Sequence, residues 1–233
     1  GAITVRVVHM TADSAQVMVE TGGRAQGRPG VHLPSERLRL TTPTDDDLVL
    51  AEAMATAGVE FIAVSFVRGG DDVRKVRAVV GDRAELVAKI ETASALAVLP
   101  DIMEASDAIM VARGDLGIDC PLEDVPHLQK AIIRRCVEFG IPVITATQML
   151  ESMITAPSPT RAEVTDVANA IFDGTDALML SGETAIGHDP ALVVDTMGRI
   201  AERAEAEASY RQWAQRLIES TTSASRRASP SAS

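Results

Sequence analysis

The sequence has few of the features that mark secreted, membrane-spanning or nucleic-acid-binding proteins. Its two cysteines, Cys120 and Cys136, are too few for a framework of disulfides. We find no signal-peptide pattern and no apolar run long enough to span a bilayer, so we expect a protein of the reducing cytoplasm. Basic residues are scarce: 22 Lys and Arg stand against 33 Asp and Glu, a net charge of −11. Such a charge repels phosphate backbones and anionic lipids, which favours a small-molecule partner and excludes nucleic acids and membranes.

A glycine-rich phosphate-binding turn is also missing. In doubly wound nucleotide-binding folds such a turn follows the first strand of the sheet. The chain nevertheless has 233 residues, of which 46% are hydrophobic, enough to bury a large core. The sequence therefore predicts a globular α/β protein of another kind.

The first thirty residues differ from the rest of the chain. Ile3, Val5 and Val7 alternate with polar residues, and a second β-rich run extends from Ala15 to Thr21. This pattern predicts a small antiparallel β element. Because Gly1 directly precedes a strand, we expect the element to begin upstream of this sequence.

From Thr41 onward, helical and strand-like segments alternate. The pattern predicts a first helix from Pro43 to Gly58, a short helix near 95–104 and a longer helix from Pro121 to Gly140. Two further helices are predicted to end at Gly81 and Gly174. Five apolar runs read as strands: 61–67, 86–91, 108–112, 142–148 and 177–181. We assign residues 1–34 to the β element, 35–219 to the α/β domain with a last helix through Trp213 and Leu217, and 220–233 to a disordered Ser-rich tail.

Polar and charged residues follow the apolar part of each strand. They are Ser65, Phe66 and Arg68; Lys89 and Glu91; Arg113 and Asp115; Thr147 and Gln148; Ser181 and Glu183. In a (β/α)8 barrel the carboxyl ends of the strands form the rim where active sites are built. We therefore predict a partial TIM (β/α)8-type barrel of parallel strands, preceded by the small antiparallel β element.

Two carboxylates and an ammonium lie at two of these strand ends. Lys89 and Glu91 fall on one side of a strand because side chains alternate along it, and Asp115 follows the next strand. Such a set could hold a divalent metal and stabilise an oxyanion. The alternative is a solvated Lys89–Glu91 pair, with Arg113-Gly114-Asp115 as a simple turn.

Taken together, these segments resemble pyruvate kinase. The matching stretches, in the order in which they occur in that family, are 65–68 (SFVR), 88–91 (AKIE), 110–117 (MVARGDLG), 144–153 (ITATQMLESM), 159–163 (PTRAE) and 180–185 (LSGETA). The similarity extends over about residues 1–205, with 30–34 as the junction between the family's small β domain and its barrel. It implies barrel strands four to eight, without the N-terminal strands or the C-terminal domain.

The resemblance implies a role for each matching residue. Lys89 would neutralise charge on the transferring phosphoryl group and the enolate, and Thr147 would lie near the methyl carbon that is protonated. Glu91 and Asp115 would carry Mg²⁺ or Mn²⁺. The substrate pocket would be lined by Ser65, Phe66, Ala112, Arg113, Gly114, Asp115 and Thr147, with backbone N–H groups at the start of the following helix as anion donors.

The implied reaction is glycolytic phosphoryl transfer from phosphoenolpyruvate to ADP, giving pyruvate and ATP. The strands that supply K⁺ ligands and part of the nucleotide site are absent, and Thr92-Ala93-Ser94-Ala95 replaces the family's Asn and Gly positions. Two alternatives stay open: a metal-dependent enolpyruvate or oxaloacetate lyase or tautomerase without nucleotide, and a non-catalytic partner subunit. Five strands cannot close a barrel, so we expect a homo-oligomer or a complementing chain.

Overall fold

The computed structural model describes residues 3–23, 31 and 42–207. The chain divides into two compact units, Gly1–Leu38 and Arg39–Ser233. The predicted junction at 30–34, except Val31, the predicted helix beyond residue 207 and the predicted tail at 220–233 lie outside the described residues. The domain boundaries assigned from the sequence stay a prediction.

The first unit contains the expected antiparallel β element. Strands β1 (Thr4–Met10) and β2 (Ala15–Thr21) pair with Val7 opposite Val17. Every residue of both strands is solvent-exposed, including the valines and methionines. A two-stranded ribbon without a covered apolar face is marginally stable on its own.

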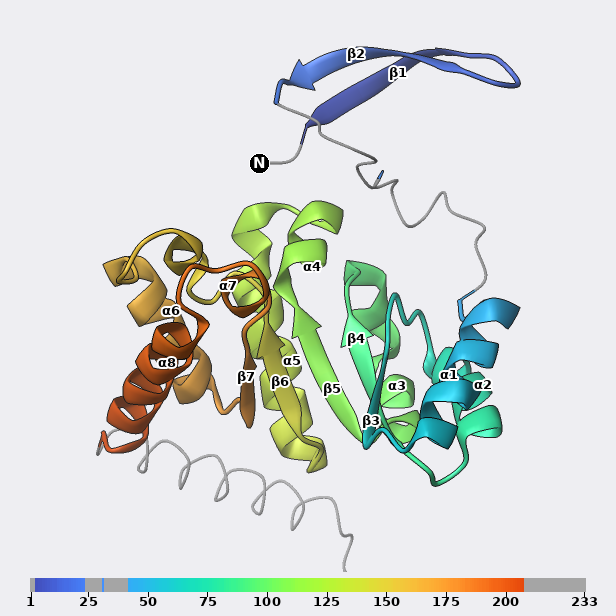
Figure 1. Cartoon of the computed structure of the whole chain (residues 1–233). Helices are drawn as coiled ribbons and strands as arrows, with labels where there is room; N and C mark the ends of the chain where they lie inside the picture. Colours follow the sequence, from blue (N-terminus) through green and yellow to red (C-terminus); the bar gives the residue numbers. More distant parts are fainter. Residues whose placement is uncertain (1–2, 24–30, 32–41, 208–233) are drawn as a thin grey trace, which may run out of the picture. The chain divides into compact units, whose positions relative to one another are not determined.

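The second unit is built on a five-stranded parallel sheet in the order β3-β4-β5-β6-β7, as the fold prediction required. The strands are β3 (Phe61–Val64), β4 (Glu85–Ile90), β5 (Ala108–Ala112), β6 (Val143–Ala146) and β7 (Ala177–Met179). The helices are α1 (Asp45–Ala57), α2 (Gly70–Val80), α3 (Leu99–Ala105), α4 (Arg113–Asp119), α5 (Val125–Phe139), α6 (Arg161–Asp173), α7 (Gly182–Ala185) and α8 (Pro190–Glu205). Figure 1 shows the strands side by side, with α1 to α3 toward β3 and α6 and α8 toward β7. Sequential parallel strands joined by helices are the repeat of a (β/α) barrel.

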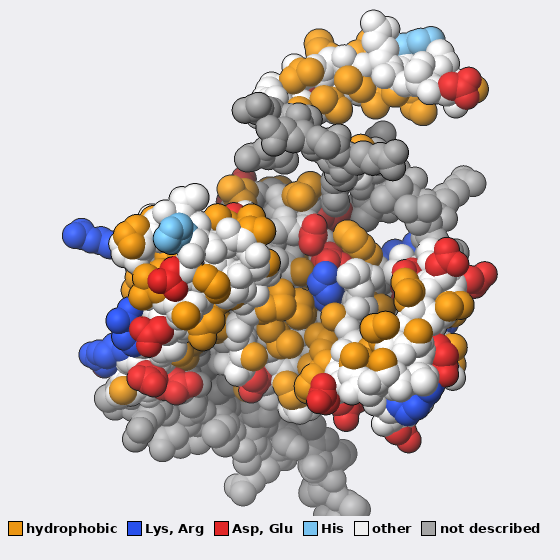
Figure 2. Space-filling view, viewed as in Figure 1, with side chains coloured by type: hydrophobic (Ala, Val, Ile, Leu, Met, Phe, Trp, Pro, Cys, Tyr) orange, Lys and Arg blue, Asp and Glu red, His pale blue; other side chains and the backbone are white. Residues whose placement is uncertain are grey.

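One face of this sheet carries the main core. Leu86, Ala88 and Ile90 of β4 are fully buried together with residues of α1, α2 and α5. The opposite face forms a smaller cluster around Val87, Met110 and Ala146. Figure 2 shows hydrophobic side chains in the middle of this unit. Alternation of side chains along each strand therefore gives two apolar faces, as expected for barrel strands.

Helix ends follow the signals seen in the sequence. Thr44 caps α1 in a capping box with Asp47, and Gly58 ends the helix in the left-handed region at φ 84°. Gly140 and Gly174 end α5 and α6 in the same conformation. These positions favour glycine because a Cβ is strained there.

Some predicted boundaries were wrong. The helix expected from Pro121 is a short 3₁₀ turn, Leu122–Asp124, followed by α5, because Pro126 fits only the first turn of a helix. The helix expected near 95–104 is likewise divided into a 3₁₀ segment, Ala93–Val98, and α3, which has Pro100 in its first turn. The strands predicted to reach Val67 and Gln148 end at Val64 and Ala146.

The early end of two strands has a local cause. Phe66, Thr147 and Gln148 have positive φ angles of 52°, 70° and 54°. Extended backbone requires negative φ, so β3 and β6 must end before these residues. Such angles are uncommon for residues other than glycine, and both turns lie at the carboxyl ends of strands.

Candidate functional site

An ammonium and a carboxylate meet at the carboxyl end of β4. Lys89 Nζ lies 2.7 Å from Glu91 Oε1 and 3.0 Å from Ser65 Oγ. The Glu91 side chain is 1% exposed and that of Lys89 is 22% exposed. The solvated-pair alternative is therefore wrong for this strand end. A buried ion pair with an added hydroxyl partner is held in one geometry and interacts strongly with nearby charge.

Glu91 also holds the turn that follows β3. Its Oε2 accepts a hydrogen bond from the backbone N–H of Phe66, the residue with φ 52°. Ser65 and Phe66 are thus joined through hydrogen bonds to Lys89 and Glu91. Four residues selected from the sequence form one connected group across β3 and β4.

A second connected group links α4 to the turn after β6. The backbone N–H of Gly114 donates to Thr147 Oγ1 at 2.7 Å. A Cβ added to Gly114 would lie 3.3 Å from that oxygen, so the close approach favours glycine. The Gly114 amide, which the sequence suggested as an anion donor, already has a protein partner. Because Thr147 Oγ1 accepts this bond, its own O–H remains available as a donor.

Arg113 opens α4 instead of lying in a simple turn. Its side chain is 9% exposed and pairs with Asp166 of α6, at 2.7 Å from Nη1 to Oδ2. Its Nη2 donates to the carbonyl oxygen of Thr147 at 2.8 Å. The guanidinium is therefore bound to α6 and to the turn after β6. If Arg113 contacts the substrate, it would do so through its backbone.

The remaining predicted residues belong to the β5–α4 junction. Ala112 is buried at the end of β5, opposite Ala146 of β6. Asp115 is partly exposed in the first turn of α4, and its carboxylate makes no hydrogen bond or ion pair with the part of the chain that the structure describes. A carboxylate without a protein partner can accept a cation or a substrate donor.

The donor set suits a hard cation. Glu91 and Asp115 offer carboxylate oxygens at the ends of β4 and β5, two adjacent strands. Mg²⁺ is commonly held by one or two carboxylates, with water and substrate oxygens as its other ligands. Within residues 3–23, 31 and 42–207 no group of three or more His, Cys, Asp or Glu is arranged to hold a metal. A metal here would therefore need oxygens from substrate and water.

Glu183 is a site neighbour to which the sequence gave no role. It is fully buried, and its Oε1 accepts the backbone N–H groups of Met149 and Leu150, each at 3.1 Å. Glu183 follows β7 as Glu91 follows β4, and this shared position after a strand was the sequence feature that could have pointed to it. Asp166, the partner of Arg113, gave no signal because it looks like any polar residue of a surface helix.

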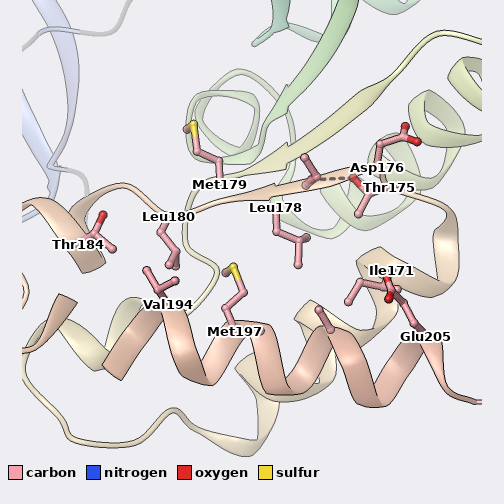
Figure 3. A pocket seen from close by; sticks show the side chains of 13 residues that line it. Ile171, Thr175, Asp176, Leu178, Met179, Leu180, Thr184, Val194, Met197 and Glu205 are labelled. Carbon is pink, nitrogen blue, oxygen red and sulfur yellow. Dashed lines mark hydrogen bonds between the residues drawn. The ribbon is translucent and has the colours of Figure 1, made fainter. Parts of the chain in front are cut away.

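A separate hollow of about 520 Å³ lies between β7 and α8 (Figure 3). Leu178 of β7, Leu180 just after that strand, and Val194 and Met197 of α8 point into it. It contains none of the predicted site residues.

No helix among the described residues is long and apolar enough to cross a bilayer.

Comparisons with known proteins agree with this architecture. The family model for the pyruvate kinase barrel domain matches residues 1–194. The chain is 50% identical to a pyruvate kinase of Methylorubrum extorquens over 210 residues, 90% of this chain and 44% of that protein. It is 47% identical to a pyruvate kinase of Agrobacterium vitis, covering 91% of the chain and 44% of the relative, and 44% identical to one of Thermotoga maritima, covering 90% and 46%.

The chain thus spans less than half the length of these curated relatives. The residues matched by the family model nonetheless include the strands, the rim residues and the turns described above. The chain belongs to the pyruvate kinase family.

Proposed function

We propose that this chain supplies the enolpyruvate and metal half of a pyruvate kinase active site. The complete enzyme would transfer a phosphoryl group between phosphoenolpyruvate and ADP, giving pyruvate and ATP. The observation that carries the proposal is the Lys89 ammonium, held between Glu91 Oε1 and Ser65 Oγ at the rim of the sheet. A fixed, partly desolvated cation stabilises negative charge that develops during a reaction.

Each residue has a chemical task in this proposal. Lys89 neutralises charge on the transferring phosphoryl group and on the enolate oxygen. The Thr147 hydroxyl donates toward the carbon that becomes the methyl group, since its oxygen already accepts from Gly114. Ser65, Phe66, Ala112, Arg113 and Gly114 line the pocket for the substrate carboxylate, and Arg113 does so through its backbone. Glu91 and Asp115 would hold Mg²⁺ or Mn²⁺, which as a Lewis acid polarises the substrate oxygens.

The nucleotide, K⁺ and the oligomeric partner belong to the same proposal. The relatives extend well beyond this chain, so ADP and K⁺ sites would require additional protein. The proposed oligomeric partner is an identical subunit or a complementing chain that covers the edges of the sheet. We place the activity in the cytoplasm, where glycolytic substrates are found.

ATP formation tests the proposal. Purified chain is supplied with phosphoenolpyruvate, ADP, Mg²⁺ and K⁺, alone and with the remaining segments of a relative, and ATP is measured by luciferase. We expect ATP in the complemented reaction. Absence of ATP in both reactions, with folded protein, would contradict the proposal.

A second candidate function is favoured by the group of residues around Lys89. The group around Lys89 is complete within the described residues, and a metal with this ammonium suffices to stabilise an enolate without nucleotide. The chain alone would then decarboxylate oxaloacetate or tautomerise enolpyruvate. Metal-dependent loss of oxaloacetate without ADP would support it. If neither oxaloacetate nor enolpyruvate is consumed, the alternative that remains is a non-catalytic partner subunit.

A further inference from the structure

The turn after β6 holds two consecutive residues in an unfavourable conformation. Thr147 and Gln148 have φ angles of 70° and 54°. A left-handed backbone is unfavourable for residues other than glycine and persists only where the surrounding structure enforces it. The contacts of this turn should therefore reveal what enforces it.

Arg113 holds the carbonyl side of the turn. Its Nη2 donates to Thr147 O at 2.8 Å and to Gln148 O at 3.3 Å. The guanidinium is itself fixed by Asp166 and by Gln129 Oε1, the latter at 3.2 Å from Nη1. A planar fork with fixed partners can orient two successive carbonyls, which a lysine ammonium cannot do as rigidly.

Glu183 holds the amide side of the same turn. Its Oε1 accepts from the N–H groups of Met149 and Leu150 at 3.1 Å, and its Oε2 accepts from Ser181 N–H at 2.9 Å. The side chain is fully buried. A buried carboxylate with three amide donors is well satisfied, and it ties the turn after β6 to the loop after β7.

The arrangement repeats one seen at the other end of the site. Glu91, also buried, accepts the N–H of Phe66, the remaining described non-glycine residue with positive φ. Both strained turns at the rim are thus held by a buried carboxylate. At β6 a buried arginine adds contacts from the opposite side.

We propose that Arg113 and Glu183 are positioning residues that clamp the 147–150 turn and thereby fix the Thr147 hydroxyl. This inference rests on the proposed function, in which Thr147 acts on the substrate. Neither side chain needs to touch the substrate. Their effect passes through the backbone of the turn, on which the Thr147 side chain and its bond from Gly114 depend.

The clamp can be tested without turnover. The threonine methyl groups are labelled with ¹³C, and the Thr147 signal is assigned by its loss in Thr147→Val. We expect Glu183→Gln and Arg113→Lys to shift or broaden this signal. Glu163→Gln is the matched control, because Glu163 also accepts backbone N–H groups in a neighbouring loop, at Ser152 and Thr160, but does not contact the turn.

An unchanged Thr147 signal in folded Glu183→Gln or Arg113→Lys would overturn the proposal. Far-ultraviolet circular dichroism shows whether each variant is folded. If a variant is unfolded, the same measurement is made on Asp166→Asn, which leaves Arg113 in place but removes its carboxylate partner. The same shift in Glu163→Gln would also count against the clamp, since the effect would then be general.

Kinetics separate positioning from a purely structural role. In the complemented ATP-forming reaction we expect Glu183→Gln to lower kcat by about 10-fold or more, with KM for phosphoenolpyruvate changed by about 2-fold at most. A change confined to KM, or to thermal stability, would contradict positioning. If the methyl signal responds but wild-type protein forms no ATP, the clamp stands and the proposed function fails.

Discussion

Lys89 Nζ lies 2.7 Å from Glu91 Oε1 inside the rim of the sheet, with the glutamate almost completely buried. One pair therefore links the proposed catalytic cation to a proposed metal ligand. Glu91 fixes the ammonium and at the same time holds Phe66 N–H. Disturbance of either partner should affect the other, because a buried charge left without its partner is costly.

Lys89→Met should lower turnover far more than it weakens substrate binding. The interaction of the ammonium strengthens as negative charge develops, so we expect kcat to fall on the order of 10²-fold or more, with a smaller change in KM. Steady-state kinetics of the complemented enzyme provide the measurement. Lys130→Met is the control, because Lys130 forms an ion pair with Asp173 away from the rim. Unchanged turnover in Lys89→Met would exclude the role.

Metal binding should depend on Asp115. We expect titration calorimetry to show Mn²⁺ binding to the wild type. The affinity of Asp115→Ala for Mn²⁺ should be lower by about tenfold or more, because one of two carboxylate ligands is lost. Asp124→Ala, which removes an exposed carboxylate near the end of α4, should bind like the wild type. Identical curves for the wild type and Asp115→Ala would remove the metal site.

Glu163 should make stability depend on pH in the acid range. Burial raises the pKa of this carboxyl, but hydrogen bonds from Ser152 and Thr160 outweigh it and lower the pKa below its usual value. Because the pKa of Glu163 is lower in the folded state, its ionised form stabilises the fold. This stabilisation is fully present above the pKa of the unfolded state, about 4.3, and is lost as the pH falls through the pKa of the folded state.

Urea unfolding of Glu163→Gln tests this dependence. We expect the variant to be less stable than the wild type by about 1 kcal/mol at pH 7. The difference should shrink when the measurement is repeated at a pH below the lowered folded-state pKa, where the wild-type carboxyl is protonated in the folded protein. An equal difference at both pH values would show that the charge of Glu163 does not contribute.

The two cysteines should differ in reactivity. Burial, with a smaller effect of the Asp176 charge, raises the pKa of Cys136 to about 12. Burial and the charges of Asp124 and Asp119 also raise the pKa of Cys120, which is only partly buried. Because the thiolate is the reactive form, Cys120 should react slowly and Cys136 should not react in the folded protein.

A thiol-specific colorimetric reagent at pH 8 provides the measurement. We expect one slow equivalent from native protein and a second equivalent only after unfolding in guanidinium. Cys120→Ser should abolish the native-state reaction. Reaction of folded Cys120→Ser would show that α5 opens more readily than its burial implies.

The isolated chain should associate in solution. β3 and β7 are the edges of an open sheet, with Phe61 exposed on one and an apolar hollow beside the other (Figure 3). Unpaired strand edges are normally covered by further protein. We expect light scattering at micromolar concentration to give a mass above that of one chain. A compact monomer that unfolds cooperatively would contradict this prediction.

Local sequence patterns determined the order and type of the elements. The five strands, the parallel sheet and the glycine-terminated helices follow from apolar periodicity and cap residues, which act over a few neighbours. The family likewise follows from motifs that are continuous in the chain. Pro100 and Pro126 likewise mark the first turns of α3 and α5, which the sequence-based boundaries did not take into account.

Tertiary structure alone decided how the rim residues are connected. Arg113 and Asp166 are 53 residues apart, and Glu183 and Met149 are 34 apart, so no local pattern relates them. The sequence marked Arg113 as a pocket residue and gave Glu183 no role, although both side chains hold the turn that carries Thr147. The reason is physical: a backbone held at positive φ needs partners from other elements, and only the folded sheet brings those elements together.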